Sequence, residues 1–182
     1  MSTSAIILAA GRSARMGELK QLLPWRGRTL IECSLAPYLE LGLPLVVVLG
    51  CEHRRIAPVL KDLPLEVVVH PEWSRGMGST LAAGVKSLGP QVERVFIGLA
   101  DMPDITPALL KALMKVQAPT VCPIHAGRRG HPVLFERTLF AELARLDGDR
   151  GARHLLSDPA LVAWPSAECL KDLDTPEDYS SP

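Results

Sequence analysis

The 182-residue sequence has few aromatic side chains and no excess of charge of either sign. Phe, Trp and Tyr make up 4% of the residues, and 20 acidic side chains balance 20 basic ones. Binding of single-stranded nucleic acid relies on aromatic stacking, and duplexes and anionic membranes attract a positive field. The composition therefore argues against nucleic acid and membranes as partners, and any functional positive charge must be local.

Cysteine is also scarce, and its spacing shows no pattern. The four cysteines are widely scattered, without a C-x-x-C pair: Cys33, Cys51, Cys122 and Cys169. Zinc sites and disulfide frameworks need patterned thiols, so we expect reduced cysteines that lie mostly in the core. The apolar run at residues 5–10 is too short for a membrane span or the core of a signal peptide. These absences favour a cytoplasmic protein.

The apolar runs that are present alternate with helix-length segments along the chain. Strands are predicted at 6–8, 45–49, 65–69, 95–100, 120–123 and 132–135. Helices are predicted at 29–39, where Pro37 should kink or split the helix, and at 53–61, 79–88, 106–116, 137–146 and 151–157. Apolar strands joined by helical crossovers indicate a parallel sheet covered on both faces. We therefore predict one α/β domain over residues 1–182, with three α/β/α layers and a mostly parallel sheet.

The stretch after the first predicted strand combines glycines with cations. Gly11 and Gly17 permit unusual backbone angles, and free amides there can form an anion nest. Arg12, Arg15 and Lys20 add positive charge, and an arginine can grip phosphate oxygens in a fork. The stretch lacks the G-x-G-x-x-G dinucleotide fingerprint and the Gly-Lys-Ser/Thr of a P-loop. It favours a triphosphate-binding loop of another kind over a plain strand–helix connection with solvated cations.

A carboxylate follows the most apolar predicted strand. Asp101 stands directly after residues 95–100, in the run Gly-Leu-Ala-Asp-Met-Pro-Asp. Ligands of parallel sheets lie beyond the carboxyl ends of the strands, and Mg²⁺ prefers one or two carboxylates plus phosphate oxygens. Asp101 is therefore the predicted Mg²⁺ ligand. An ordinary aspartate at the start of a helix is the alternative, which suits Asp104, two residues before Thr106, better.

These patterns resemble one family of nucleotidyltransferases. Leu-Ala-Ala-Gly-Arg-Ser-Ala-Arg-Met-Gly-x-x-Lys at 8–20 and Ala-Asp-Met-Pro at 100–103 are similar to the molybdenum cofactor guanylyl- and cytidylyltransferases. Further blocks follow in family order at 71–81, 130–135, 148–153 and 172–178. The resemblance covers nearly the whole chain and implies a Rossmann-like nucleotidyltransferase fold. It is closest to the cytidylyl branch, because Ala10 stands where guanylyl enzymes usually have a second glycine.

The resemblance implies a nucleotide site with a metal. Its nucleotide-binding residues would be Leu8, Ala9, Ala10, Gly11, Arg12, Arg15, Lys20, Ser79 and Asp101. Arg15 and Lys20 would act in catalysis by neutralising charge at the α-phosphorus and on the leaving pyrophosphate. Asp101 and Asp174 would hold Mg²⁺, with Asp172 as an alternative second ligand. Ser79 would contact the base or ribose, or serve as an N-cap, or do both.

The resemblance also implies an acceptor, a pterin that carries a phosphate monoester. His131 and Arg153 would face it, although a packed histidine and a salt-bridged arginine are alternatives. Arg128 and Arg129 would form a basic rim or, as we favour, lie in solvent. The expected reaction moves CMP from CTP to the terminal phosphate of molybdenum-loaded molybdopterin and releases pyrophosphate, and a molybdoenzyme would receive the product. Rival hypotheses are another nucleotide or phosphorylated acceptor, and a relative that delivers the cofactor or performs nicotinamide-dependent redox chemistry.

Overall fold

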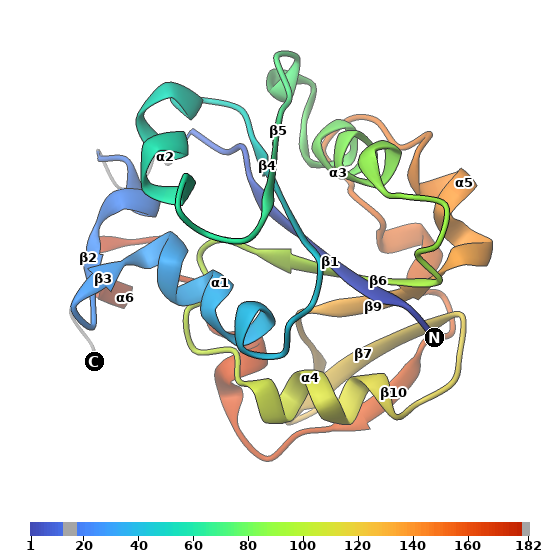
Figure 1. Cartoon of the computed structure of the whole chain (residues 1–182). Helices are drawn as coiled ribbons and strands as arrows, with labels where there is room; N and C mark the ends of the chain where they lie inside the picture. The colour runs from blue at the N-terminus through green and yellow to red at the C-terminus, as the bar shows by residue number, and fades with distance from the viewer. Residues whose placement is uncertain (13–17, 180–182) are drawn as a thin grey trace.

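The computed structural model of the protein describes residues 1–12 and 18–179, and a sheet runs through its centre (Figure 1). The sheet strands are β1 (Thr3–Ala9), β4 (Leu45–Leu49), β5 (Glu66–Val69), β6 (Arg94–Leu99), β7 (Thr120–His125), β8 (Arg128–Arg129), β9 (Val133–Glu136) and β10 (Ala160–Ala163). Their order is β10-β7-β9-β6-β1-β4-β5, with β8 paired to β7. A separate hairpin consists of β2 (Pro24–Trp25) and β3 (Arg28–Thr29).

Most neighbouring strands of the sheet are parallel. β1 is parallel to β4 and β6, β4 is parallel to β5, and β7 is parallel to β10. β8 is antiparallel to β7, and β9 is antiparallel to both β6 and β7. A parallel return needs a crossover of about a dozen residues, whereas short loops join β7, β8 and β9. The prediction of a mostly parallel α/β sheet is confirmed, and the short loops explain its antiparallel members.

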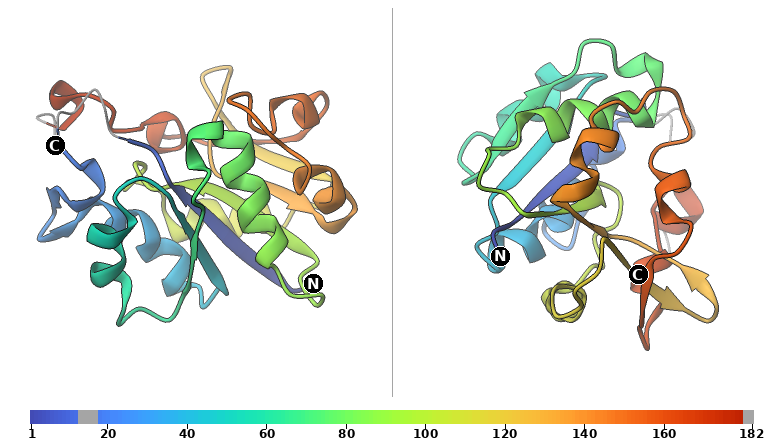
Figure 2. Two further views of the ribbon diagram at one scale, coloured as in Figure 1. Left: turned by 90° about the horizontal axis from the view of Figure 1, so that it is seen from above. Right: turned by 90° about the vertical axis from the view of Figure 1, so that its right-hand side faces the viewer.

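Helices cover both faces of the sheet, as Figure 2 shows. They are α1 (Leu30–Glu40), α2 (His53–Leu60), α3 (Met77–Ser87), α4 (Pro107–Met114) and α5 (Phe140–Leu143), and α6 (Pro176–Tyr179) follows near the end of the chain. Ala5 and Ile7 pack in one cluster with α1, α2 and α4, whereas Ile6 packs in the other with α3 and α5. The predicted three layers are thereby confirmed. Within residues 1–12 and 18–179, no helix is long and apolar enough to cross a membrane.

Several local predictions are also confirmed. Thr29 forms a capping box with Glu32 at the start of α1, and the hydroxyl of Thr106 accepts a hydrogen bond from the Leu109 amide at the start of α4. Pro37 is expected to kink or split this helix, but α1 runs on through it without a split, since a proline past the first turn removes only the one hydrogen bond of its own missing N–H. The cysteines are free, two half-buried and two in the core: Cys33, Cys51, Cys122 and Cys169.

Two predicted helices in the last third are shorter than expected. Residues 137–146 form a 3₁₀ turn, η3 (Arg137–Leu139), before the four residues of α5. Residues 151–157 form only η4 (Arg153–Leu156), a 3₁₀ helix. Gly148 and Gly151 have φ angles of +68° and +53°, which a helix does not accommodate. The remaining 3₁₀ helices are η1 (Lys20–Leu22), η2 (Trp73–Arg75) and η5 (Ala167–Leu170).

A buried arginine joins the sheet to α4. Arg94, in β6, has 3% of its surface exposed. Its guanidinium donates hydrogen bonds of 2.9 Å and 2.6 Å to the carbonyl oxygens of Met114 and Val116, at the carboxyl end of α4. Burial lowers the pKa of Arg94, and Glu136 partly opposes this effect. The arginine thus satisfies carbonyl groups that the end of a helix leaves without an intrahelical partner.

We predict that Arg94→Met lowers the free energy of unfolding by about 2–4 kcal/mol, because it removes a buried donor and leaves two half-buried carbonyl groups without it. Urea denaturation followed by circular dichroism measures the change. Arg54→Met, on the exposed side of α2, is the control and should change stability by no more than about 0.5 kcal/mol. Equal stability of the two variants would contradict the role given to Arg94.

Candidate active site

The candidate site lies beyond the carboxyl ends of β1 and β6, which are neighbours in the sheet. A cavity of about 530 Å³ opens there. Predicted nucleotide-site and metal residues line it: Leu8, Ala9, Ala10, Gly11, Arg12, Lys20, Asp101 and Asp174. Two of the residues predicted for this loop, Arg15 and Gly17, lie outside the described residues. The structure therefore brings the opening loop and the carboxylate after β6 to one cavity, as the rule for parallel sheets predicts.

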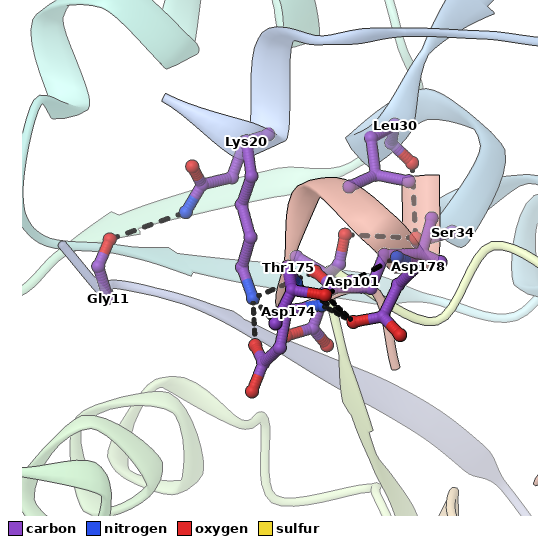
Figure 3. A network of polar contacts seen from close by, with 11 residues as sticks. Gly11, Lys20, Leu30, Ser34, Asp101, Asp174, Thr175 and Asp178 are labelled. Atoms are coloured by element: carbon purple, nitrogen blue, oxygen red, sulfur yellow. Dashed lines mark hydrogen bonds and ion pairs between the residues drawn. The ribbon is translucent and has the colours of Figure 1, made fainter. Parts of the chain in front are cut away.

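Lys20 connects the two aspartates of this cavity (Figure 3). Its Nζ donates hydrogen bonds of 2.6 Å to Asp101 Oδ2 and 2.7 Å to Asp174 Oδ1. The side chain of Lys20 is 14% exposed, that of Asp101 18% and that of Asp174 36%. Burial lowers the pKa of Lys20, but the charges and hydrogen bonds of Asp101 and Asp174 together raise it above its usual 10.5. The ammonium group is therefore charged and held between two carboxylates.

Backbone contacts fix the loop that carries Asp101. The hydroxyl of the buried Ser34, in α1, lies 2.9 Å from the carbonyl oxygen of Ala100 and 3.1 Å from that of Leu30. The amide of Leu173 donates a 3.0 Å hydrogen bond to the carbonyl oxygen of Asp101. Sequence reasoning missed Ser34, because a serine in the middle of a helix gives no signal of such a contact.

Asp178 holds the segment that carries Asp174. Its Oδ2 accepts hydrogen bonds from the amides of Asp174 and Thr175, at 3.2 Å and 2.9 Å, and from the Thr175 hydroxyl at 2.9 Å. The side-chain bond to Thr175 and the two amide bonds lower the pKa of Asp178. The amide of Asp178 in turn donates to the Thr175 hydroxyl, as in a capping box. The Thr-x-x-Asp spacing of residues 175–178 is a sequence signal that could have identified this role.

We predict that Asp178→Ala speeds hydrogen exchange of the Asp174 and Thr175 amides roughly fivefold at neutral pH, because their common acceptor is lost. Exchange followed by NMR measures this, and Asp158→Ala is the matched control at an exposed aspartate. Unchanged exchange at both amides would show that Asp178 does not anchor them.

Two expectations about the opening loop and α3 need correction. Gly11 does not have a positive φ, and an added Cβ there would meet nothing within 4 Å, so its backbone is ordinary and open to the cavity. α3 begins at Met77 with Gly76 as its N-cap, so Ser79 is not the cap. The Ser79 hydroxyl lies 2.9 Å from the Gly76 carbonyl oxygen and 3.1 Å from His70 Nε2. Thr80 lines the cavity instead, and contact of Ser79 with a base or ribose stays a prediction.

Gly76 and Gly78 let a second loop close over the start of α3. A Cβ on Gly76, whose φ is +112°, would collide with the Asp149 carboxylate and the Gly148 backbone. The amide of Gly78 donates a 2.7 Å hydrogen bond to the Gly148 carbonyl oxygen. The guanidinium of Arg75 donates hydrogen bonds of 3.1 Å and 2.6 Å to the Asp147 carboxylate. These contacts bring Asp149 to the edge of the cavity, a placement that sequence reasoning missed.

A second cavity of about 440 Å³ adjoins the first. The two cavities share Leu8, Met77, Leu99, Asp149 and Asp172 in their walls. Both predicted acceptor residues, His131 and Arg153, line the second cavity, as do Arg128, Arg129 and Arg150. Arg129 also donates a 2.7 Å hydrogen bond to the Leu156 carbonyl oxygen. Arg128 and Arg129 are exposed to solvent, as expected, and both also border this cavity.

His131 reaches the site because β9 is antiparallel. The start of β9 pairs with the carboxyl end of β6, at Val133 and Ile97, so the residue two positions before β9 lies near Asp101. The ring atom Nδ1 of His131 is buried and has no hydrogen-bond partner among the described residues. Burial lowers the pKa of His131, although nearby Asp101 and Asp172 oppose this effect. The ring is therefore neutral at pH 7 and can offer a polar atom to a ligand.

We predict that the His131 ring titrates below pH 6.5. Its pKa is lowered in the folded protein, so its contribution to stability is constant above pH 6.5 and declines as the pH falls through that value. NMR of histidine ring carbons across pH 5–8 measures the midpoint, with His131→Gln to assign the signal. A midpoint above 6.5 would contradict the burial that lowers the pKa.

The two carboxylates at Lys20 also fit a divalent cation. Asp101 Oδ1 is buried and has no hydrogen-bond partner among the described residues. In the part of the chain that the structure describes, no group of three or more His, Cys, Asp or Glu side chains forms a complete metal cage. Mg²⁺ usually takes one or two carboxylates and completes its shell with water and substrate phosphates, so Asp101 and Asp174 suffice for it.

A Rossmann-like sheet with a basic loop and paired carboxylates at its carboxyl edge is the architecture of nucleotidyltransferases, and comparisons agree. Residues 5–164 match the family model described as the MobA-like NTP transferase domain. The chain belongs to this family.

Relatives in this family carry different names. The molybdenum cofactor cytidylyltransferase of Escherichia coli is 28% identical over 96% of this chain and 92% of its own. The nicotine blue oxidoreductase of Paenarthrobacter nicotinovorans is 31% identical over 96% and 92%. The crystal structure of Rv0371c from Mycobacterium tuberculosis superposes with a TM-score of 0.90 at 31% identity, covering 98% of this chain and 95% of that one. Another structure of Rv0371c, in complex with manganese, has a TM-score of 0.86 at 28% identity over 98% and 96%.

Proposed function

We propose that the protein transfers CMP from CTP to the terminal phosphate of molybdenum-loaded molybdopterin and releases pyrophosphate. The observation that carries this proposal is the pair of adjoining cavities with a common wall. One contains Lys20 together with the two carboxylates that it contacts, and the other has arginines and a neutral histidine. Two anionic substrates could meet at the shared wall. The family relationship and the name of the E. coli relative support the same reaction.

The reaction needs no nucleophilic side chain. An oxygen of the acceptor phosphate, already an anion at neutral pH, forms a bond to the α-phosphorus of CTP, and the bond from that phosphorus to the pyrophosphate breaks. Lys20 and Arg12 would neutralise phosphate charge in the first cavity, and Arg15 is proposed for the same task from its position in the sequence. The protein's contribution is then the positioning of two substrates and the stabilisation of charge.

Mg²⁺ is the proposed metal, and Asp101 and Asp174 would hold it. When bound, it supplies positive charge that counters the phosphates of the nucleotide. The manganese complex of Rv0371c, a structure similar to this chain, supports a divalent cation in general. Asp172, which borders both cavities, is the less favoured second ligand because Asp174 is the residue paired with Lys20.

The second cavity suits a flat acceptor with an anionic end. Apolar side chains form part of its wall, including Leu81, Val133 and Phe135. Arg128, Arg129, Arg150 and Arg153 supply positive charge along the same cavity. A pterin ring could pack on the apolar side chains while the arginines attract the phosphate monoester, and His131 could accept or donate one hydrogen bond. A molybdoenzyme would then receive the product.

The methyl group of Ala10 favours a pyrimidine. Ala10 is 6% exposed and lines the first cavity beside Trp73. Both side chains pack around Gly50, where an added Cβ would lie 2.8 Å from the Ala10 methyl group and collide with Trp73. A glycine in place of Ala10 would leave more room for a purine. We therefore propose CTP over GTP.

A redox or delivery function is the second candidate, because one relative at 31% identity is named an oxidoreductase. Such a protein would bind a nicotinamide cofactor or the molybdenum cofactor without cleaving CTP. The paired carboxylates and the charged lysine favour transfer instead, since a binding module has no need of a metal site. Thermal-shift measurements with CTP and with nicotinamide nucleotides distinguish the two candidates.

We predict that the purified protein, with Mg²⁺ and molybdenum-loaded molybdopterin, converts CTP faster than GTP, ATP or UTP. Mass spectrometry of the product and measurement of released pyrophosphate check this. Asp101→Asn should lower the rate by about 10²–10³-fold, because charge stabilisation at the phosphates is lost. Asp104→Asn is the matched control, since Asp104 pairs with Arg26 and Lys171 rather than with Lys20.

Faster turnover with GTP would reverse the base assignment, and no turnover with any nucleotide would contradict transferase activity. Near-normal turnover in Asp101→Asn would contradict the metal assignment.

A further inference from the structure

The ammonium group of Lys20 lies at a point where oxygen atoms from two segments converge. Asp101 follows β6, and Asp174 and the Leu173 carbonyl precede α6. The three oxygens lie 2.6 Å, 2.7 Å and 3.4 Å from Nζ. The two carboxylate oxygens are therefore no farther apart than twice 2.7 Å. Mg²⁺ binds oxygens at about 2.0–2.1 Å, so a cation at this point would reach both carboxylates after a small inward movement.

The ammonium group of Lys20 and a divalent cation carry charge of the same sign. Two carboxylates hold the ammonium group in a half-buried place. A divalent cation would balance both carboxylates. It would also repel the ammonium group strongly at such short range, since partial burial weakens the screening by water. Lys20 and the cation therefore compete for the same oxygens.

We propose that Lys20 occupies the place of the divalent cation in the nucleotide-free protein and that the two exclude one another there. A triphosphate supplies the alternative partner for the lysine, because its oxygens attract the ammonium group as strongly as carboxylates do. Arrival of the nucleotide then draws Lys20 away and opens Asp101 and Asp174 to the cation. This inference rests on the proposed nucleotide site.

The exchange makes nucleotide and cation binding mutually dependent. If CTP removes the competitor of the cation, CTP raises the affinity for the cation, and by linkage the cation raises the affinity for CTP by the same factor. Part of this coupling disappears when position 20 has no charge. A protein without nucleotide would bind the cation only weakly, because the cation must displace Lys20, and the lysine charge would reach the phosphates once the metal has taken over the carboxylates.

The first experiment measures Mn²⁺ binding to the nucleotide-free protein by electron paramagnetic resonance and calorimetry. Lys20→Met should bind Mn²⁺ at least about tenfold more tightly than the unaltered protein, because the competing charge is gone. Lys171→Met is the matched control: it removes a lysine 3.5 Å from Asp104, which is not in the cavity, and should leave Mn²⁺ affinity unchanged. Equal or weaker binding by Lys20→Met would overturn the proposal.

Two further variants locate the gained affinity and guard against misfolding. The double variant Lys20→Met with Asp101→Asn should lose the gain, and a gain that persists would overturn the assignment to these carboxylates. Lys20→Gln keeps a hydrogen-bond donor and should show the same direction of change if Lys20→Met is unstable.

A titration of the unaltered protein with Mg²⁺ tests the exchange directly. NMR of the lysine ammonium groups should show that the Lys20 signal shifts and that the Lys171 signal stays in place. An unmoved Lys20 signal at saturating Mg²⁺ would contradict the exchange.

The outcome is separate from that of the proposed reaction, because these measurements contain neither CTP nor acceptor. Tighter Mn²⁺ binding in Lys20→Met without CMP transfer by the unaltered protein would support the exchange and contradict the reaction. CMP transfer by the unaltered protein, without tighter Mn²⁺ binding in Lys20→Met, would support the reaction and contradict the exchange.

Discussion

The attraction between one ammonium group and two carboxylates joins three distant parts of this chain. Lys20 lies near the start of the sequence, Asp101 near its middle and Asp174 near its end. The sheet places the loop after β1 beside the loop after β6, and the chain returns at Leu173 to bond with the Asp101 backbone. Ser34 bonds to the backbone next to Asp101, and Asp178 bonds to the backbone next to Asp174. The first cavity thus depends on contacts that lie outside its own lining.

Much of the fold could be predicted because buried parallel strands leave an unmistakable pattern of apolar runs, as at residues 45–49 and 95–100. Ligands bind at the carboxyl ends of such strands, and this rule predicted that Lys20 and Asp101 would lie close together, as they do. Other features depend on packing between distant segments, which periodicity does not encode. The loop around Gly148 closes on the start of α3, and this contact decides where that helix begins and which side chains face the cavity.

Two residues that sequence reasoning missed act on backbone atoms of other segments. Ser34 contacts the carbonyl of Ala100, and Arg94 contacts carbonyls at the end of α4. A serine or arginine of this kind looks ordinary in a sequence, because its partner is chosen by the fold and carries no distinctive side chain. The charged residues that line the first cavity were easier to predict, because Lys20 and Asp101 follow apolar strands in the sequence.

The reversed direction of β9 has a consequence for divergence within the family. It places the residue stretch from Arg128 to Leu156 along the second cavity, whereas the first cavity is built largely from the opening loop and the start of α3. The two cavities share Leu8, Met77, Leu99, Asp149 and Asp172, but the rest of each wall comes largely from a different run of sequence. Substitutions within residues 128–156 can therefore reshape most of the second cavity while the opening loop stays unchanged, which is one way in which relatives with dissimilar names can diverge.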